Sequence, residues 1–284
     1  MKKIFLIFIL LNFFACFGKE RAENVLSKKD ELVNLTETVS SRQIESQLKQ
    51  ELLLTKDSFL ANFQNRLPVE IIDKTVANFD EFFDDIEKLA NNDAELLILV
   101  DKEHFLPADF VPQDLLELKN NEFFSVSRKG MHATEEAVKA LSKMGEEANK
   151  AGITLLVSSA YRSYELQKTL FTRYASQYGE KEASRFSARA GTSQHQLGTA
   201  FDFGSITDAF AETRAGKWLD ANAERFGFSL SFPKGYETVT GYKWECWHYR
   251  YVGVEACKMQ EKWFGNIQQY MLEVLHWYTG FCEN

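Results

Sequence analysis

Hydrophobic and polar positions alternate in several short stretches of the chain, a period typical of β-strands. Phe201 and Phe203 flank Asp202, so a strand over residues 199–203 packs both rings on one side and presents the carboxylate on the other. A continuous apolar run, LLILV at residues 96–100, indicates a buried strand. Three more strands are expected, at residues 153–157, 228–232 and 242–252.

Apolar side chains at helical spacing, bounded by capping residues, predict the helices between these strands. Thr134 is placed to cap a helix that ends near Gly152, and Ser163 to cap one that ends at Gly179. Other helices are expected at residues 80–89, 217–226 and 255–277. This order of elements predicts an α+β fold with a small, mainly antiparallel sheet flanked by helices. Residues 17–90 form a helical extension outside it.

Composition narrows the class of protein. Hydrophobic residues make up 45% of the 284 positions and charged residues 26%, which is typical of a soluble globular domain. The formal net charge is -8, so the chain offers no basic surface for nucleic acid. An acidic substrate has to be held by individual side chains.

The first sixteen residues differ from the rest. Met1, Lys2 and Lys3 precede an apolar run that is shorter than the roughly 20 residues needed to cross a bilayer. The segment 1–16 is therefore predicted to be a secretory signal, and the protein to be exported to the periplasm or cell envelope. Ala15 before Cys16 resembles the end of a lipoprotein signal, which would anchor the chain to a membrane through lipid on Cys16. Ordinary cleavage near Ala15 is the alternative.

Cysteine usage limits how a metal could be held. Cys246, Cys257 and Cys282 lie beyond the signal, an odd number that excludes a disulfide scaffold. They also lack the short paired spacing of a structural zinc site. Any metal site must therefore use histidines and carboxylates.

Two histidines and one aspartate are arranged as candidate ligands. His195 and Asp202 lie on either side of Gly198, where the backbone can turn so that both side chains converge. His248 is the third candidate, and Glu245 is placed to act as a general base beside it. Residues three apart on a regular strand face opposite ways, so these last two can share a site only where the strand is interrupted or ends.

Three strings of sequence carry a resemblance to a known family. They are SSAYRS at residues 158–163, SQHQLGTAFD at residues 193–202 and ECWHYRYVG at residues 245–253. In order and separation they resemble the signature blocks of the VanY-type D-alanyl-D-alanine carboxypeptidases, over a region that begins near residue 97 and ends near residue 270. The catalytic domain is accordingly expected at residues 91–284.

The resemblance implies a role for each residue of these blocks. One zinc ion per chain would be bound by His195, Asp202 and His248, with Glu245 as base and then acid, and Arg162 stabilising the oxyanion. Substrate contacts would come from a further set, less firmly matched to the family pattern: Gln167, Ser193 and Tyr161.

The implied activity is removal of the carboxy-terminal D-alanine from peptidoglycan stem peptides. The motifs do not separate this from an L,D-carboxypeptidase or a peptidoglycan endopeptidase on the same fold. A non-catalytic module that binds the cell wall is a third hypothesis, and the complete set of ligands, base and arginine argues against it.

Overall fold

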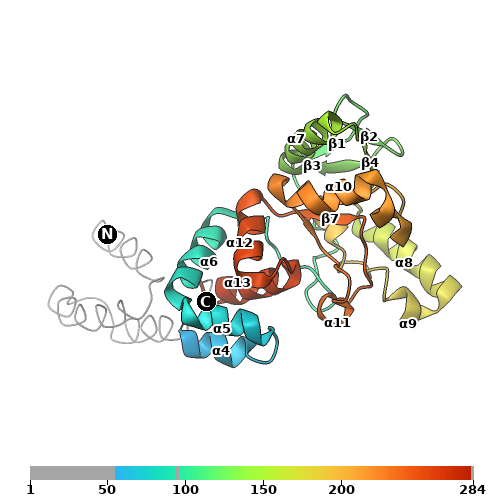
Figure 1. Ribbon diagram of the computed structural model, residues 1–284. Coiled ribbons are helices and arrows are strands. Elements are labelled where there is room, and N and C mark those ends of the chain that lie inside the picture. Colours follow the sequence, from blue (N-terminus) through green and yellow to red (C-terminus); the bar gives the residue numbers. More distant parts are fainter. Residues whose placement is uncertain (1–54, 94–95, 283–284) are drawn as a thin grey trace, which may run out of the picture. The chain divides into compact units, whose positions relative to one another are not determined.

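The computed structural model of the protein describes residues 55–93 and 96–282 (Figure 1). The predicted signal at 1–16, its Cys16 and the first part of the helical extension lie outside these residues. The chain divides into two compact units, and the larger one spans Glu95–Leu272. The smaller unit contains the described residues before and after it, so that the second boundary falls inside the last helix.

A five-stranded sheet forms the centre of the larger unit. Its strand order is β2-β4-β5-β7-β6, with β2 parallel to β4 and all other neighbours antiparallel. The strands are β2 (Phe124–Val126), β4 (Leu155–Ser159), β5 (Ala200–Phe203), β7 (His248–Tyr251) and β6 (Phe228–Leu230). A separate antiparallel pair consists of β1 (Leu115–Glu117) and β3 (His132–Thr134). The predicted small, mainly antiparallel sheet is therefore confirmed.

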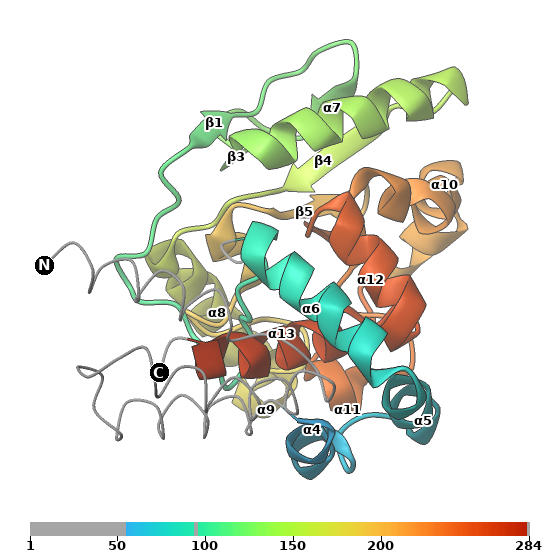
Figure 2. The same ribbon diagram turned by 90° about the vertical axis from the view of Figure 1, so that its left-hand side faces the viewer.

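Helices of two kinds surround this sheet. The α-helices of the larger unit are α7 (Glu135–Lys150), α8 (Tyr164–Tyr178), α9 (Glu180–Ala183), α10 (Arg214–Asn222), α11 (Glu237–Thr240) and α12 (Val254–Phe264). Short 3-10 helices are η1 (Gln194–Leu197), η2 (Asp208–Glu212) and η3 (Ala223–Phe226). α7 lies alongside β3 and β4 in both views (Figure 1, Figure 2). The mixed α+β fold is confirmed.

Capping residues begin and end α8 as predicted. Ser163 is the N-cap of α8, and its hydroxyl accepts a hydrogen bond from the Leu166 N–H. Gly179 ends that helix with a positive φ of 81°. Thr134 stands at the N-cap of α7 but makes no side-chain capping bond there; the Glu135 N–H is instead bound by the carboxylate of Asp114.

The two faces of the sheet have different contents. Phe201, Phe203 and Tyr249 belong to one hydrophobic core together with Leu141 of α7 and Val157 of β4. Asp202 alternates with these phenylalanines and points to the opposite face, as the sequence predicted. Both faces of β5 are buried, so the carboxylate lies in a sheltered environment.

One strand prediction was wrong and a second was too long. Residues 96–100 are not a strand, although Leu97, Leu99 and Val100 are buried. A side chain holds this segment, where a strand would be held by backbone hydrogen bonds to its neighbours. One Arg250 nitrogen donates to the carbonyls of Leu96 and Ile98, both at 2.9 Å. The strand expected over 242–252 is limited to β7, because the residues before it form turns.

The smaller unit is built from helices. They are α4 (Lys56–Phe63), α5 (Val69–Ala77), α6 (Phe79–Asp93) and the later part of α13 (Gln268–Cys282). Phe59 packs edge-on against Phe82 with ring centroids 5.3 Å apart, and Phe83 packs against Tyr278 at 5.4 Å. The helix predicted at residues 80–89 is confirmed. Among the described residues, no helix has the length and apolar character that crossing a bilayer requires.

Candidate metal and catalytic site

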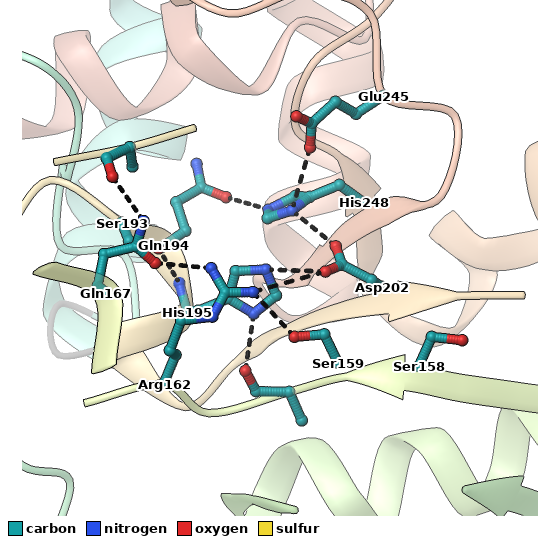
Figure 3. Close-up of polar contacts among 12 residues, drawn as sticks. Ser158, Ser159, Arg162, Gln167, Ser193, Gln194, His195, Asp202, Glu245 and His248 are labelled. Carbon is teal, nitrogen blue, oxygen red and sulfur yellow. Dashed lines mark hydrogen bonds and ion pairs between the residues drawn. The ribbon is translucent and has the colours of Figure 1, made fainter. Parts of the chain in front are cut away.

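Three predicted ligands converge on the polar face of the sheet (Figure 3). His195 comes from η1, Asp202 from β5 and His248 from β7. Asp202 lies between the two imidazoles: one carboxylate oxygen is 3.3 Å from His195 Nε2 and the other is 3.1 Å from His248 Nδ1. One ligand atom from each residue lies within 4.8 Å of the others, and all three residues are buried. The structure thus brings the predicted ligand set together.

A left-handed glycine allows the first two ligands to converge. Gly198 ends η1 with φ 72°, so the chain turns from His195 into β5, which carries Asp202. A Cβ at this position would lie 3.0 Å from the Leu115 side chain and 3.2 Å from that of Thr134. Both the backbone conformation and the available space therefore favour glycine here.

The tautomer of His195 is fixed by a backbone carbonyl. Its Nδ1 lies 2.7 Å from the Ala160 oxygen, which can only accept, so Nδ1–H donates and Nε2 presents a lone pair toward Asp202. Metal-binding histidines commonly donate their second ring N–H in this way. The same segments are tied again by the Arg162 N–H, which donates to the His195 carbonyl at 3.1 Å.

The charge states of the cluster suit a divalent cation. Burial alone would raise the pKa of Asp202, but the adjacent His195 and His248 reverse this and hold it well below its usual range. Burial lowers the pKa of His195 to about 4, although Asp202 acts in the opposite direction. At neutral pH the cluster therefore offers a carboxylate and neutral imidazole, the donor set of catalytic zinc sites with an open fourth position.

Glu245 lies next to the cluster in the turn that precedes β7. The His248 N–H donates to the Glu245 carbonyl, which marks a turn, and the strand begins only at His248. This strand end allows residues three apart to face the same site, with Glu245 Oε2 3.7 Å from His248 Nδ1. Burial, with help from Asp202, raises the pKa of Glu245 well above its usual value, while Arg162 opposes the rise.

Arg162 approaches the cluster from the side opposite Glu245 (Figure 3). Its guanidinium donates to Gln167 Oε1 at 2.6 Å and to Ser159 Oγ at 3.0 Å, and lies 3.9 Å from Asp202. Burial lowers the pKa of Arg162, and the charges of Asp202 and Glu245 counter this. An arginine remains charged under such conditions, so a cation faces the cluster.

The predicted substrate residues have different placements. Gln167 is buried and also donates to the Ala188 carbonyl at 2.5 Å, so it orients Arg162 from a fixed position. Ser193 is the N-cap of η1, where its hydroxyl accepts from the His195 N–H at 3.3 Å. Tyr161 is half-buried, and within the described part of the chain its hydroxyl makes none of the polar contacts of the cluster.

A cavity of about 430 Å³ borders Glu245. Its walls include the aromatic side chains of Phe186, Trp244 and Trp247. Arg185 also lines it and forms an ion pair with Glu237 at 2.6 Å. The cavity places free volume directly beside the proposed base.

Sequence reasoning missed two residues that touch the site. Ser159 binds Arg162, and Gln194 lies with its Oε1 3.2 Å from His248 Nε2. Both stand inside the recognised strings, and Gln194 lies between Ser193 and His195, which were singled out. Their positions gave a signal, but only the structure shows which way their side chains point.

A buried site of two histidines and an aspartate, with an acidic residue on one side and an arginine on the other, defines a metallopeptidase. A family profile described as "VanY: D-alanyl-D-alanine carboxypeptidase" matches residues 130–254. The chain is 34% identical over 241 residues to the protein YodJ of Bacillus subtilis, whose name assigns it provisionally to the carboxypeptidases; the match covers 81% of this chain and 85% of YodJ. A D-alanyl-D-alanine carboxypeptidase of Enterococcus faecium is 28% identical over 62% of this chain and 57% of its own length.

Solved structures agree with these matches. The LdcB LD-carboxypeptidase superimposes with a TM-score of 0.56 at 36% identity, over 62% of this chain and 84% of its own. VanY from a VanB-type vancomycin resistance cassette, solved in complex with Zn(II), gives 0.53 at 30% identity, over 63% of this chain and 99% of its own. The protein belongs to the VanY family of D-alanyl-D-alanine carboxypeptidases. It is a zinc carboxypeptidase.

Proposed function

We propose that the protein removes the carboxy-terminal D-alanine from peptidoglycan stem peptides, with His195, Asp202 and His248 as zinc ligands. The observation that carries this proposal is the convergence of these ligands with Glu245 and Arg162 in one buried site. The similarity to a D-alanyl-D-alanine carboxypeptidase of Enterococcus faecium supports the choice of substrate.

Each residue has a task that follows from its position. Zinc supplies a Lewis acid and lowers the pKa of water in such sites. Glu245 accepts the proton of the attacking water and returns it to the leaving amine, for which a raised pKa is suitable. Arg162, fixed by Gln167 and Ser159, presents N–H donors to the oxygen on which negative charge develops.

A second activity is supported by a specific comparison. The LdcB LD-carboxypeptidase matches at 36% identity, against 30% for VanY of the VanB-type cassette. An L,D-carboxypeptidase would cut one bond earlier, between the diamino acid and the first D-alanine. An endopeptidase acting on cross-linked stems is the third alternative on this fold.

Defined stem peptides separate these activities. We expect the protein to convert a pentapeptide ending in D-Ala-D-Ala to the tetrapeptide and to leave the tetrapeptide uncut, with released D-alanine measured by chromatography. Cleavage of the tetrapeptide with no cleavage of the pentapeptide would establish the L,D activity instead. Glu245→Gln protein serves as the inactive control, and binding of stems by wild-type protein without any cleavage would favour a wall-binding module.

The substrate lies outside the cytoplasmic membrane, which agrees with the export signal proposed for residues 1–16. Lipid attachment at Cys16 would keep the enzyme in the cell envelope. Mass spectrometry of the mature amino terminus tests this proposal, with Cys16→Ser as the matched variant. A mature wild-type chain that begins at Cys16 and carries no lipid would refute anchoring and leave export in place.

A further inference from the structure

Gln194 contacts the outer side of His248, away from the ligand cluster. The side chain is 6% exposed, and its Oε1 lies 3.2 Å from His248 Nε2 and 2.7 Å from Ser231 Oγ. Its Nε2 lies 3.2 Å from Gln268 Oε1. A buried amide thus connects an imidazole to two further polar side chains.

The direction of each hydrogen bond in this series of side chains follows from one backbone carbonyl. The Ser229 carbonyl can only accept, so the group of Gln268 that faces it at 3.4 Å must be the amide nitrogen. The oxygen of Gln268 then faces Gln194, so the amide nitrogen of Gln194 must donate to it. The Gln194 oxygen is left to face His248.

This order favours one position for the proton on His248. An amide oxygen only accepts, so Gln194 favours a hydrogen on His248 Nε2. The Asp202 carboxylate, 3.1 Å from Nδ1, also only accepts, but a cation held by both residues would need the Nδ1 lone pair, which the Nε2–H form supplies. The opposite tautomer would direct an N–H into the ligand cluster and leave two acceptors facing each other at 3.2 Å.

We infer that Gln194 is a positioning residue that selects the metal-binding tautomer of His248, with Ser229 and Gln268 fixing its orientation. Ala160 does the same for His195 with a backbone oxygen, so both imidazoles are set from outside the cluster. The inference rests on His248 being a zinc ligand, as in the proposed function. Its prediction for the metal-free protein can be measured independently of activity.

Gln194→Met removes the acceptor at similar side-chain volume. Loss of a partner of this kind typically weakens metal binding by about 10- to 100-fold, and we expect that loss in a zinc competition titration against a chelator. Gln194→Glu retains an oxygen toward His248, so its zinc affinity should exceed that of Gln194→Met by about tenfold or more. Nitrogen-15 shifts of the His248 ring should report a larger fraction of the Nε2–H tautomer in metal-free wild-type protein than in metal-free Gln194→Met.

Gln196→Met is the matched control. Gln196 is equally buried, two residues away, and donates to the carbonyls of Pro107 and Phe110 without touching His248. The Gln196→Met substitution should lower the free energy of unfolding, while zinc affinity and the His248 tautomer stay as in wild type. An Nε2–H fraction in metal-free wild-type protein no larger than in Gln194→Met overturns the inference, and so does an equal loss of zinc affinity in Gln194→Met and Gln196→Met. Full zinc binding by His248→Ala would instead refute the ligand assignment itself.

Discussion

Asp202 and His248 are direct cross-strand partners in the antiparallel register of β5 and β7. Their side chains leave the sheet on the same face, with His248 Nδ1 3.1 Å from Asp202 Oδ1. Because the backbone ladder fixes such neighbours, these two proposed ligands are held side by side by the fold itself. Only His195 has to be added from outside the sheet.

The purified protein should contain about one zinc per chain, because three ligands with an open position match a catalytic site. His195→Ala and His248→Ala should each lose most of it, as measured by metal analysis after dialysis. His132→Ala is the control, since this half-buried histidine lies outside the cluster. Full zinc content in both ligand variants would contradict the assignment.

Glu245→Gln should retain zinc and the fold but lose turnover. The amide cannot accept the proton, and general base catalysis typically contributes about 100- to 10,000-fold. Turnover on a D-Ala-D-Ala stem is measured beside zinc content. Glu224→Gln, at a partly buried glutamate elsewhere, should remain near wild type. Near-normal turnover in Glu245→Gln would show that another group takes the proton.

Arg162→Lys should lower turnover by roughly 100- to 1,000-fold, the usual effect of losing an oxyanion donor. Lysine keeps the charge but cannot reach Gln167 and Ser159 at once, as the planar guanidinium does. Zinc content should be unchanged. Arg128→Lys, which alters an exposed arginine, controls for the substitution, and wild-type turnover in Arg162→Lys would refute the role.

Cleavage should resist β-lactams and stop on treatment with a metal chelator, because no serine acyl-enzyme takes part in a metal-dependent route. Added zinc should restore it. The measurement is D-alanine release with penicillin, with chelator, and after zinc is returned. Covalent labelling of a serine by penicillin, together with loss of activity, would require a different mechanism.

Acid should destabilise the metal-free protein through His195. Its folded pKa of about 4 lies below the ordinary 6.5, so the unfolded chain binds the extra proton between these values. The contribution of neutral His195 is complete above about pH 6.5 and declines as pH falls toward 4. The shift corresponds to a loss on the order of 3 kcal/mol at most.

Urea unfolding of wild-type and His195→Gln protein, both metal-free and compared above about pH 5, where unfolded aspartate is ionised, tests this effect. Glu245 acts in the opposite sense, because its raised pKa favours folding at low pH. Since His195 is not among the causes of that shift, Glu245 contributes equally to both proteins and cancels. A wild-type protein whose stability falls no more than that of the variant would refute the prediction.

Local patterns were enough to predict most elements. Ser163 and Gly179 bound a helix through capping and positive φ, and alternation placed Asp202 on the face opposite Phe201. Residues 96–100 failed because apolar burial alone does not distinguish a strand from a segment held by a side chain. The Arg250 that holds this segment lies about 150 positions further along the chain.

The proposed ligands and base could be singled out from the sequence because they lie in short strings. Gln194 stood in such a string, but its role depends on Ser231 and Gln268, which are distant in sequence and meet it only in the fold. No periodicity reports that kind of contact. Networks of buried amides therefore had to be found in the structure.

Two hydrogen bonds join residues 160–162 to His195, one through the His195 ring and one through its carbonyl. They bear on how the family can diversify. Between these residues the chain passes through α8 and α9. The segment that follows α9 supplies Arg185 and Phe186 to the cavity wall. Both ends of this stretch of chain are fastened at the site, so its length can change at a cost that grows slowly, about 0.6 kcal/mol per doubling of a flexible loop. The wall of this cavity can thus be rebuilt by insertion while the proposed catalytic centre keeps its geometry.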